Sequence, residues 1–315
     1  MQSFRLFFAA SGPRGAQTIA RGRHVADVCS HGVDTGFVDL GYAKVAVLGL
    51  VQGVTELLPI SSTAHMRIVP FLLGWQDPGS AFSAAMQMAA LAAVVSYFWS
   101  DIRQIALGSI AAMAAKRWHS QEFRLALGIV IATIPIVVAG AAAAHFLNAC
   151  ATPARALIVI AVACLVMSAL LALAEILAIH TRTINEMRLR DALIVGIAQV
   201  GALIPGVSRS GSTLTAALCL DLKREEAARF SFLLGLPAIA LAGLKELWTL
   251  HEAGLSPHGW VILVFGLLIA SISAFFAIWG LMRFLEHFST WPFVAYRFLL
   301  GVLLLILAIW GYGAI

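Results

Sequence analysis

From about residue 42 onward, apolar residues form long runs separated by short polar breaks. Runs of about 20 apolar residues are long enough to cross a bilayer as helices. By this criterion we expect full membrane spans at residues 81–99, 123–146, 154–180, 228–250, 260–282 and 292–310. The pattern therefore predicts an all-α integral membrane protein, folded as a multi-span helical bundle.

Two other apolar runs are only about half a span long, and each ends in a break rich in proline, glycine and serine. Residues 45–58 lead into Pro59, and residues 193–204 lead into Pro205. Proline and glycine at such a position end a helix. We expect both runs to be half-helices.

The two short runs also resemble each other. An alignment without gaps places Gln52 opposite Gln199 and Ser61 opposite Ser208. The likeness is weak evidence alone, because glycine, serine and isoleucine are common in membrane helices. It gains weight if the two runs enter the membrane from opposite sides.

Positive charge indicates the orientation of the chain. The connectors at residues 100–122 and 181–190 carry many of the lysines and arginines, so we place them in the cytoplasm. The first short run then enters from outside and the second from the cytoplasm. This predicts two inverted-topology repeats, at about 41–180 and 190–315, each containing a re-entrant broken helix pair. The two breaks should face each other inside the protein. Glu175, near the cytoplasmic end of its span, is expected to be solvated.

Composition supports a membrane protein and excludes other classes. Hydrophobic residues make up 61% of the chain and charged residues 12%, against roughly a quarter charged in soluble domains. The net charge is +5, but no basic face with interleaved aromatic residues is present, so we expect no nucleic-acid partner. The four cysteines have no metal-like spacing, and we assign neither a disulfide nor a zinc site.

Residues 1–40 differ from the rest of the chain. They are rich in arginine, and their apolar core at residues 6–10 is shorter than the ~7–15 residues of a secretory signal. We expect a disordered tail or an over-long gene start there, rather than a cleaved signal or transit peptide. Residues 41–315 form one transmembrane domain.

The first polar cluster begins with Gln52 and Glu56, which are four residues apart and share one helix face. A carboxylate at the bilayer centre costs ~2.5–3.5 kcal/mol on insertion scales, so it needs a partner. Oxygen ligands suit Mg²⁺ or Ca²⁺, and we take Gln52 and Glu56 as candidate ligands of a divalent cation. The alternative is a protonated glutamic acid that only packs helices.

Hydroxyl groups and a histidine follow the first break. These residues are Ser61, Ser62, Thr63 and His65. Hydroxyls after a break commonly cap the next helix. A serine near a base is also typical of nucleophilic catalysis. The residues alone leave open whether these hydroxyls only cap the helix or whether one of them is a nucleophile with His65 as its base.

The second break supplies positive charge. Arg209 is a planar cation suited to phosphate oxygens. It is flanked by candidate substrate-binding residues: Ser208, Ser210, Gly211 and Thr213. The start of the following half-helix adds backbone N–H groups, so this segment predicts an anion site. The alternative is a purely structural salt bridge between Arg209 and Glu56.

Four motifs together carry a family resemblance. QGVTELLPISSTAH (52–65), PGVSRSGST (205–213), FSFLLGLP (230–237) and PFVAYRF (292–298) resemble the undecaprenyl-diphosphate phosphatase family linked to bacitracin resistance. The resemblance runs from about residue 42 to the C-terminus. It implies a multi-pass enzyme of the bacterial inner membrane, which removes the terminal phosphate of undecaprenyl diphosphate and returns the lipid carrier to peptidoglycan synthesis.

The resemblance also implies a divalent cation and an active site open to the outer, periplasmic side. By position it assigns catalytic roles to Glu56, Ser62, His65 and Arg209, and phosphate contacts to the hydroxyls around Ser62 and Arg209, including Ser61 and Thr63. On this basis we predict Ser62 as the nucleophile, with Glu56 or His65 as its base, and leave open direct attack by water. We add Arg297 as a substrate-binding residue, although it could instead anchor its helix at an interface. The sequence leaves open the metal and the oligomeric state, with a homodimer as one alternative.

Two positions depart from the family pattern. Gln52 stands where many members have glutamate, which weakens the expected metal site, and Ala64 stands where glycine is usual. The phosphatidic-acid type of lipid phosphatase is excluded, because its nucleophilic histidine would fall on Thr215. The rival function is a lipid flippase or secondary transporter, since those proteins also use inverted repeats with broken helices.

Overall fold

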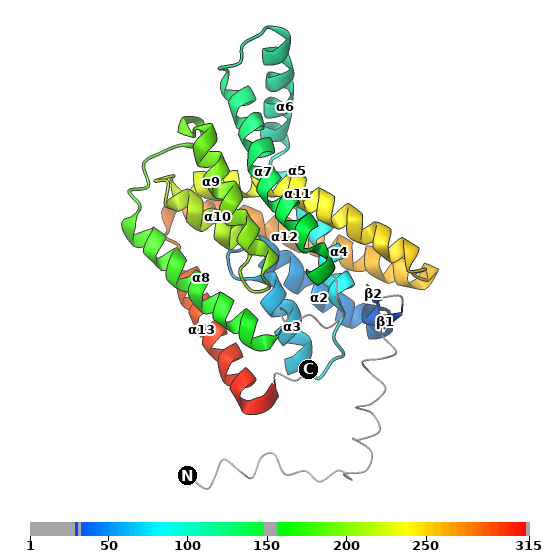
Figure 1. Cartoon of the computed structure of the whole chain (residues 1–315). Helices are drawn as coiled ribbons and strands as arrows, with labels where there is room; N and C mark the ends of the chain where they lie inside the picture. Colours follow the sequence, from blue (N-terminus) through cyan, green and yellow to red (C-terminus); the bar gives the residue numbers. More distant parts are fainter. Residues whose placement is uncertain (1–28, 31–32, 148–155, 313–315) are drawn as a thin grey trace, which may run out of the picture.

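The computed structural model describes residues 29–30, 33–147 and 156–312, and nearly all of them are helical (Figure 1). The only strands in this part of the chain are the two-residue antiparallel pair β1 (Cys29–Ser30) and β2 (Val33–Asp34). The first half contains η1 (Gly36–Leu40), α2 (Gly41–Leu57), α3 (Ser62–Leu72), α4 (Ser80–Ala85), α5 (Gln87–Tyr97), α6 (Trp99–Ala114), α7 (Gln121–Leu147) and α8 (Leu157–Leu177). The second half contains η3 (Ile184–Glu186), α9 (Leu189–Val200), η4 (Gly201–Leu203), α10 (Arg209–Leu218), α11 (Arg224–Glu252), α12 (Pro257–His287), α13 (Trp291–Leu307) and η5 (Ala308–Tyr312).

Five of the six expected spans fall on helices that are long and apolar enough to cross a membrane. These helices are α7, α8, α11, α12 and α13. The membrane class predicted from the hydrophobic pattern is therefore confirmed at the level of helix length and composition.

The span expected at residues 81–99 is different. A bend of 76° separates Ala81–Tyr97 from α6, so this segment is a bent helix pair rather than one straight span. The following segment, expected as a charged connector, is helical as far as Ala114. The charged residues of this segment did not reveal that it is helical. α6 and the start of α7 project from the rest of the bundle (Figure 1).

The first short run is longer than expected. η1 and α2 form a continuous 22-residue helical run, Gly36–Leu57, which is long enough to cross a membrane. Phe37 in η1 is fully buried and stacks on Phe82, with ring centroids 4.9 Å apart. The ordered domain therefore begins before residue 41, the expected boundary, while the rest of the predicted tail lies largely outside the described residues. The second short run matches the prediction, because α9 has only 12 residues.

The two breaks share an unusual backbone geometry. Ser61 and Ser208 are the N-caps of α3 and α10, and their φ angles are +74° and +68°. Each side chain accepts a hydrogen bond from the N–H three residues on, at 3.4 Å from Ala64 and 3.2 Å from Gly211. Positive φ in a residue other than glycine costs on the order of 1–3 kcal/mol and is concentrated at functional sites. The two serines aligned by sequence therefore have the same strained conformation.

Helix packing crosses between the two halves of the chain. α2 packs mainly on α12, α9 packs mainly on α7, and α8 lies along α13 (Figure 1). Each short helix that precedes a break is therefore held by a long helix of the other half.

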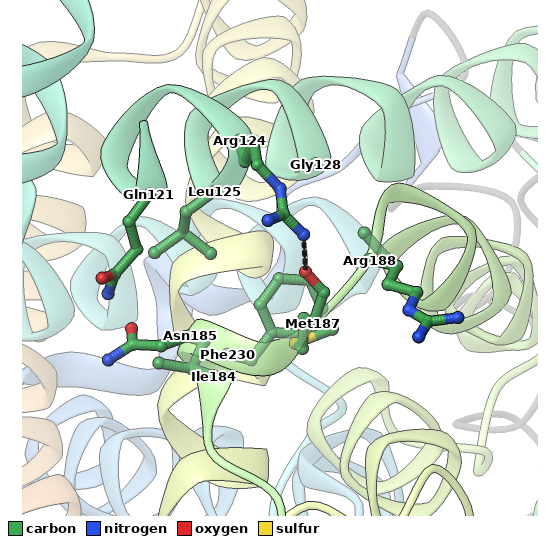
Figure 2. A pocket seen from close by; sticks show the side chains of 10 residues that line it. Gln121, Arg124, Leu125, Gly128, Ile184, Asn185, Met187, Arg188 and Phe230 are labelled. Atoms are coloured by element: carbon green, nitrogen blue, oxygen red, sulfur yellow. Dashed lines mark hydrogen bonds between the residues drawn. The ribbon is translucent and has the colours of Figure 1, made fainter. Parts of the chain in front are cut away.

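Polar contacts hold the segment between α8 and α9 against its neighbours. Arg182 donates to Asp191 at 2.6 Å. Burial raises the pKa of the Asp191 carboxyl, but hydrogen bonds from Arg182 and from the Arg188 backbone outweigh it, and the pKa is lowered. Arg124 of α7 donates to the Met187 carbonyl at 3.0 Å, across a small pocket (Figure 2).

Glu175 is buried, with 7% of its surface exposed. Its carboxylate pairs with Arg224 and accepts a hydrogen bond from the Thr290 hydroxyl at 2.8 Å. The expectation that Glu175 is solvated was wrong, because its partners come from α11 and from the N-cap of α13.

Candidate active site

The two breaks lie against each other. The Ser210 hydroxyl, in the first turn of α10, is 3.1 Å from the Leu58 carbonyl and 3.3 Å from the Glu56 carbonyl. Pro59 explains why α2 ends here, since the residue before a proline is driven out of the helical region. Leu58 accordingly has extended backbone angles. The prediction that the two breaks face each other is confirmed.

The Glu56 carboxylate is the centre of the polar cluster. Oε2 accepts hydrogen bonds from Gln52 Nε2 at 2.9 Å and from the Ser62 hydroxyl at 2.6 Å. Oε1 accepts from Arg209 at 3.1 Å. Glu56 is 7% exposed. The carboxyl thus faces three hydrogen-bond donors, one of them the Arg209 cation.

Ser62 is the first residue of α3 and remains half-buried. Its hydroxyl proton points to Glu56, so the carboxylate is within reach to accept that proton. This is the geometry that the sequence required of a nucleophile and its base.

His65 is turned to other partners. Nδ1 is 2.7 Å from the Ser61 carbonyl and Nε2 is 2.6 Å from the Tyr296 hydroxyl. A carbonyl oxygen can only accept, so Nδ1 carries the proton, and in the neutral ring Nε2 accepts from Tyr296. Of the two bases left open by the sequence, the geometry favours Glu56 for Ser62.

Arg209 links the second break to the first. Besides Glu56, its guanidinium contacts the Gly235 carbonyl at 3.2 Å. Beside it, the hydroxyls of Ser208 and Ser210 are 3.2 Å apart. The arginine, the serines and Glu56 therefore form one continuous polar surface between the two breaks.

Arg297 occupies a different place from the one predicted. It is 1% exposed, and its guanidinium binds backbone carbonyls on both breaks. The acceptors are Pro59 at 3.1 Å, Gly206 at 2.6 Å, Val207 at 2.5 Å and Cys164 at 3.3 Å. Arg297 thus joins the two breaks through these carbonyls, and we call this set of contacts the Arg297 clamp. A Cβ on Gly211 would lie 2.7 Å from this guanidinium, so Gly211 makes room for the clamp rather than facing a ligand.

Of the other residues predicted to bind substrate, two are fully buried and two are partly exposed. Ser61 and Thr213 are 1% and 0% exposed. Ser61 serves as a helix cap, and the Thr213 hydroxyl bonds to the Arg209 carbonyl and to Ser231. Thr63 and Ser208 are half-buried. Thr63 and Ser208 therefore keep a partly exposed surface, whereas Ser61 and Thr213 have supporting positions.

Sequence reasoning gave no role to Tyr296, which approaches His65 from a helix more than 200 residues further along the chain. The two rings are nearly parallel, with centroids 5.6 Å apart. The only available signal was its place beside Arg297 in the PFVAYRF motif.

The donor set limits the kind of metal site that fits. In the described part of the chain, no group of three or more His, Cys, Asp or Glu side chains could hold a metal ion. Gln52 and Glu56 together offer one carboxylate and, if the Gln52 amide turns its oxygen to where its N–H now donates to Glu56, one amide oxygen. Mg²⁺ is often held by one or two carboxylates together with substrate phosphates. These two residues therefore fit a cation that is shared with a phosphate ligand, and they do not make a complete cage.

Comparison with known proteins places the chain in a family. Residues 45–303 match the family described as "Bacitracin resistance protein BacA". Undecaprenyl-diphosphatase 2 of Mesorhizobium japonicum is 70% identical over 256 residues, covering 81% of this chain and 97% of the relative. The undecaprenyl-diphosphatase of Gloeobacter violaceus is 51% identical over 266 residues, covering 84% and 91%. That of Synechocystis is 47% identical over 289 residues, covering 90% and 89%.

The matched region contains both breaks, the Glu56 cluster and the Arg297 clamp. The identity to these relatives extends over most of each chain. This chain belongs to the bacitracin resistance protein BacA family.

Proposed function

We propose that this protein hydrolyses undecaprenyl diphosphate to undecaprenyl phosphate and inorganic phosphate. The product returns to peptidoglycan synthesis as the lipid carrier, and faster recycling confers resistance to bacitracin. The observation that carries the proposal is the contact between Ser62 and Glu56 beside Arg209, in a chain that is 70% identical to a named undecaprenyl-diphosphatase.

In the proposed reaction, Ser62 attacks the terminal phosphorus while Glu56 takes the hydroxyl proton. The bond between that phosphorus and the bridging oxygen breaks, and undecaprenyl phosphate leaves with the electron pair. Glu56 passes the hydroxyl proton to the leaving phosphate oxygen and is a carboxylate again. It then takes a proton from a water molecule, which attacks the phosphoserine; the phosphorus–Ser62 oxygen bond breaks, the serine oxygen takes the proton back from Glu56, and phosphate is released. The alternative is direct attack by a water molecule that Glu56 activates, with Ser62 binding phosphate.

Positive ends of two helices support phosphate binding at this place. Ser62 begins α3 and Arg209 begins α10, and both contact Glu56. Helix N-termini bind anions through free N–H groups and the helix dipole. The Glu56 carboxylate thus contacts the first residue of each of these helices, and in our proposal Arg209 exchanges it for a phosphate oxygen.

A divalent cation, Mg²⁺ or Ca²⁺, completes the proposal. Glu56 and the amide oxygen of Gln52 would hold it together with diphosphate oxygens. When bound, it would neutralise negative charge on the leaving phosphate. With glutamine at position 52, only one carboxylate faces the cation, so we expect weak binding in the absence of substrate.

The proposed architecture is an inverted repeat whose two re-entrant broken helices meet at the site. Two observations support it. Ser61 and Ser208, aligned by sequence, have matching positive φ angles and matching caps. α2 and α9 are also packed reciprocally, each on a long helix from the other half. We place the protein in the inner membrane with the site open to the periplasmic side.

The test uses purified protein in detergent with undecaprenyl diphosphate, and follows phosphate release with Mg²⁺, with Ca²⁺ and with a chelator. Release that needs a divalent cation is the expected result. If no phosphate is released under any divalent cation while the lipid still binds, the flippase or transporter alternative takes precedence. Reconstitution into vesicles, with the lipid assayed on both faces, would then measure translocation directly.

A further inference from the structure

A small pocket between α7 and α9 has two arginines in its lining (Figure 2). Its polar lining comes from Gln121 and Arg124 of α7, Asn185 of η3 and Arg188, the N-cap of α9. Phe230 of α11 adds an apolar wall. No residue of the candidate active site lines this pocket. The pocket is therefore a second place where cations and amides gather, and the proposed reaction does not use it.

The size of the pocket limits what can enter it. Its volume is about 20 Å³, which is room for about one water-sized group. One oxygen of an anion can therefore enter, while the rest of the ligand stays at the mouth. Figure 2 shows the amides of Gln121 and Asn185 facing each other on one side of the Arg124 guanidinium, and Arg188 on the other side. An anion at the mouth would meet N–H donors from three elements.

The two arginines have donors and charge to spare. The only hydrogen bond from the Arg124 side chain to the described residues runs to the Met187 carbonyl, at 3.0 Å. A guanidinium has five N–H donors, so most of them remain for a ligand. Within the described chain, neither Arg124 nor Arg188 forms an ion pair with a carboxylate. By contrast, Arg182 on the same connector is paired with Asp191 at 2.6 Å.

The acidic residues closest in sequence to the lining have other partners. Glu122 packs against α6, since a Cβ on Gly108 would lie 2.6 Å from the Glu122 side chain. Glu186 accepts from the N–H and the hydroxyl of Thr183, at 2.6 and 3.0 Å. Glu226 accepts from a backbone N–H of η3 at 3.2 Å. The charge at the mouth of the pocket is therefore set by the two arginines.

The starts of two helices add to the positive charge, because α7 and α9 both begin at the pocket. A Cβ on Gly128 would lie 3.2 Å from the Ala192 Cβ. One turn further along, a Cβ on Gly196 would lie 2.3 Å from the Ala132 carbonyl. The two helices therefore leave the pocket in the same direction and in contact. Their dipoles and first N–H groups both favour an anion at this end.

The two helices also carry an exposed apolar surface. On α7, Val130 and Ile134 are 60% and 53% exposed. On α9, Ile194 and Ile197 are 47% and 57% exposed. A soluble anion would use only the pocket, whereas a lipid would place its phosphate there and its acyl chains along apolar helix surface. The combination favours a lipid headgroup as the occupant.

We propose that this pocket binds the phosphate group of an anionic phospholipid in the cytoplasmic leaflet. Basic pockets between membrane helices on that side bind anionic headgroups in other proteins. One phosphate oxygen enters beside Arg124, and Arg188 contacts the headgroup from the mouth. Lipid bound in this way would hold the start of α9 against α7. The proposal does not depend on the proposed function, because its test measures lipid binding and does not measure phosphate release.

The experiment follows the melting temperature of the purified full-length protein in a neutral detergent while lipid is added. Dioleoylphosphatidylglycerol is the anionic probe, and dioleoylphosphatidylcholine is the zwitterionic one. A ligand that binds only the folded protein raises its melting temperature. For the wild type, we expect the anionic lipid to raise it by about 3 °C or more above the zwitterionic lipid. Arg188→Gln should at least halve this difference, and the double variant Arg124→Gln/Arg188→Gln should abolish it.

Arg117→Gln is the matched control. Arg117 is an exposed arginine in the connector between α6 and α7, and it does not line the pocket. The variant loses the same charge and should keep the full shift. Arg188→Gln leaves the contact between Arg124 and Met187 in place, so it carries the test if the double variant does not fold. Native mass spectrometry of the same samples should show phosphatidylglycerol retained by the wild type and by Arg117→Gln, and much less of it retained by Arg188→Gln.

Three results would overturn the proposal. Equal shifts in the wild type, Arg117→Gln and Arg188→Gln would show that the lipid responds to surface charge in general. An equal shift with inorganic phosphate at the same concentration would assign the pocket to a soluble anion. No difference between the two lipids in the wild type would show that the pocket does not select an anionic headgroup.

Discussion

The hydroxyl of Ser62 lies 2.6 Å from Oε2 of Glu56, across the break that separates α2 from α3. Glu56 is the last-but-one residue of α2, and Ser62 is the first residue of α3. The four residues between these helices fold back so that the end of one helix faces the start of the next. This single relationship brings an acceptor carboxylate and an activated hydroxyl into one site, with Arg209 on the other carboxylate oxygen.

Ser62→Ala removes the proposed nucleophile, and we expect kcat to fall by about 10³-fold or more, as it does when the nucleophile of a covalent mechanism is lost. The measurement is phosphate release by folded, purified protein. Ser96→Ala is the control, because the Ser96 hydroxyl donates to Ala92 within α5, away from the site. Near-normal release by Ser62→Ala would show that water attacks directly.

Glu56→Gln keeps the shape of the side chain but removes its charge and its basicity. Activity should fall by about 10²–10⁴-fold, the usual contribution of a general base. Arg209, 13% exposed, would lose its counter-charge, and breaking a buried pair costs about 3–5 kcal/mol of folding free energy. Thermal melting in detergent should therefore show a lower melting temperature. An unchanged melting temperature would mean that Arg209 finds another partner or that the pair adds little stability.

The polar cluster was predictable from sequence because its members are grouped along the chain. Gln52, Glu56 and Ser62 lie within one short segment, and helix periodicity already places the first two on one face. Arg209 was predictable because the second break repeats the chemistry of the first. The contact between the two breaks was predictable as well, because irregular backbone at membrane depth must be buried in protein or line a water-filled cavity.

The other features of the site and fold could not be predicted, because they depend on contacts between residues that are far apart in the sequence. Tyr296 reaches His65, and Arg297 reaches Pro59, over separations of more than 200 residues, which no local pattern encodes. Glu175 looked solvated because its partners Arg224 and Thr290 are remote in sequence. The bend before α6 was missed because hydropathy reports burial in lipid and does not report direction.

Asp191 predicts a pH-dependent contribution to stability. Its pKa is lowered in the folded state, mainly because hydrogen bonds from Arg182 and from the Arg188 backbone outweigh the effect of burial. The stabilisation is therefore complete above the unfolded value, about 3.9, and is lost as the pH falls through the lower folded pKa. Asp191→Asn lacks this contribution, so its melting temperature should approach that of the wild type only below about pH 4. Glu252→Gln, at an exposed position, is the control and should show no such convergence.

Tyr296 and His65 should act as one unit. Tyr296→Phe removes the hydroxyl that donates to His65 Nε2, and a hydrogen bond of this kind is worth about 0.5–1.5 kcal/mol, or roughly a 2- to 12-fold change in kcat/KM. His65→Ala should cost more. Because the tyrosine acts through the histidine, the double variant should be no worse than His65→Ala, which a double-mutant cycle measures. Additive losses would show that Tyr296 contributes independently of His65.

Gln52→Glu tests the cation site, because it places a second carboxylate beside Glu56, where the Gln52 amide now donates at 2.9 Å. Without a metal ion, two carboxylates at this distance repel each other, so the variant should melt at a lower temperature than the wild type in chelator. With Mg²⁺ or Ca²⁺ the order should reverse, because the added charge strengthens binding to a hard cation. We expect the cation concentration for half-maximal phosphate release to fall about tenfold, which corresponds to about 1.4 kcal/mol. Gln199→Glu, at the aligned position of the other half, controls for the cost of burying a carboxylate. If Gln52→Glu is destabilised equally with and without cations and its cation requirement is unchanged, then Gln52 and Glu56 do not bind the metal.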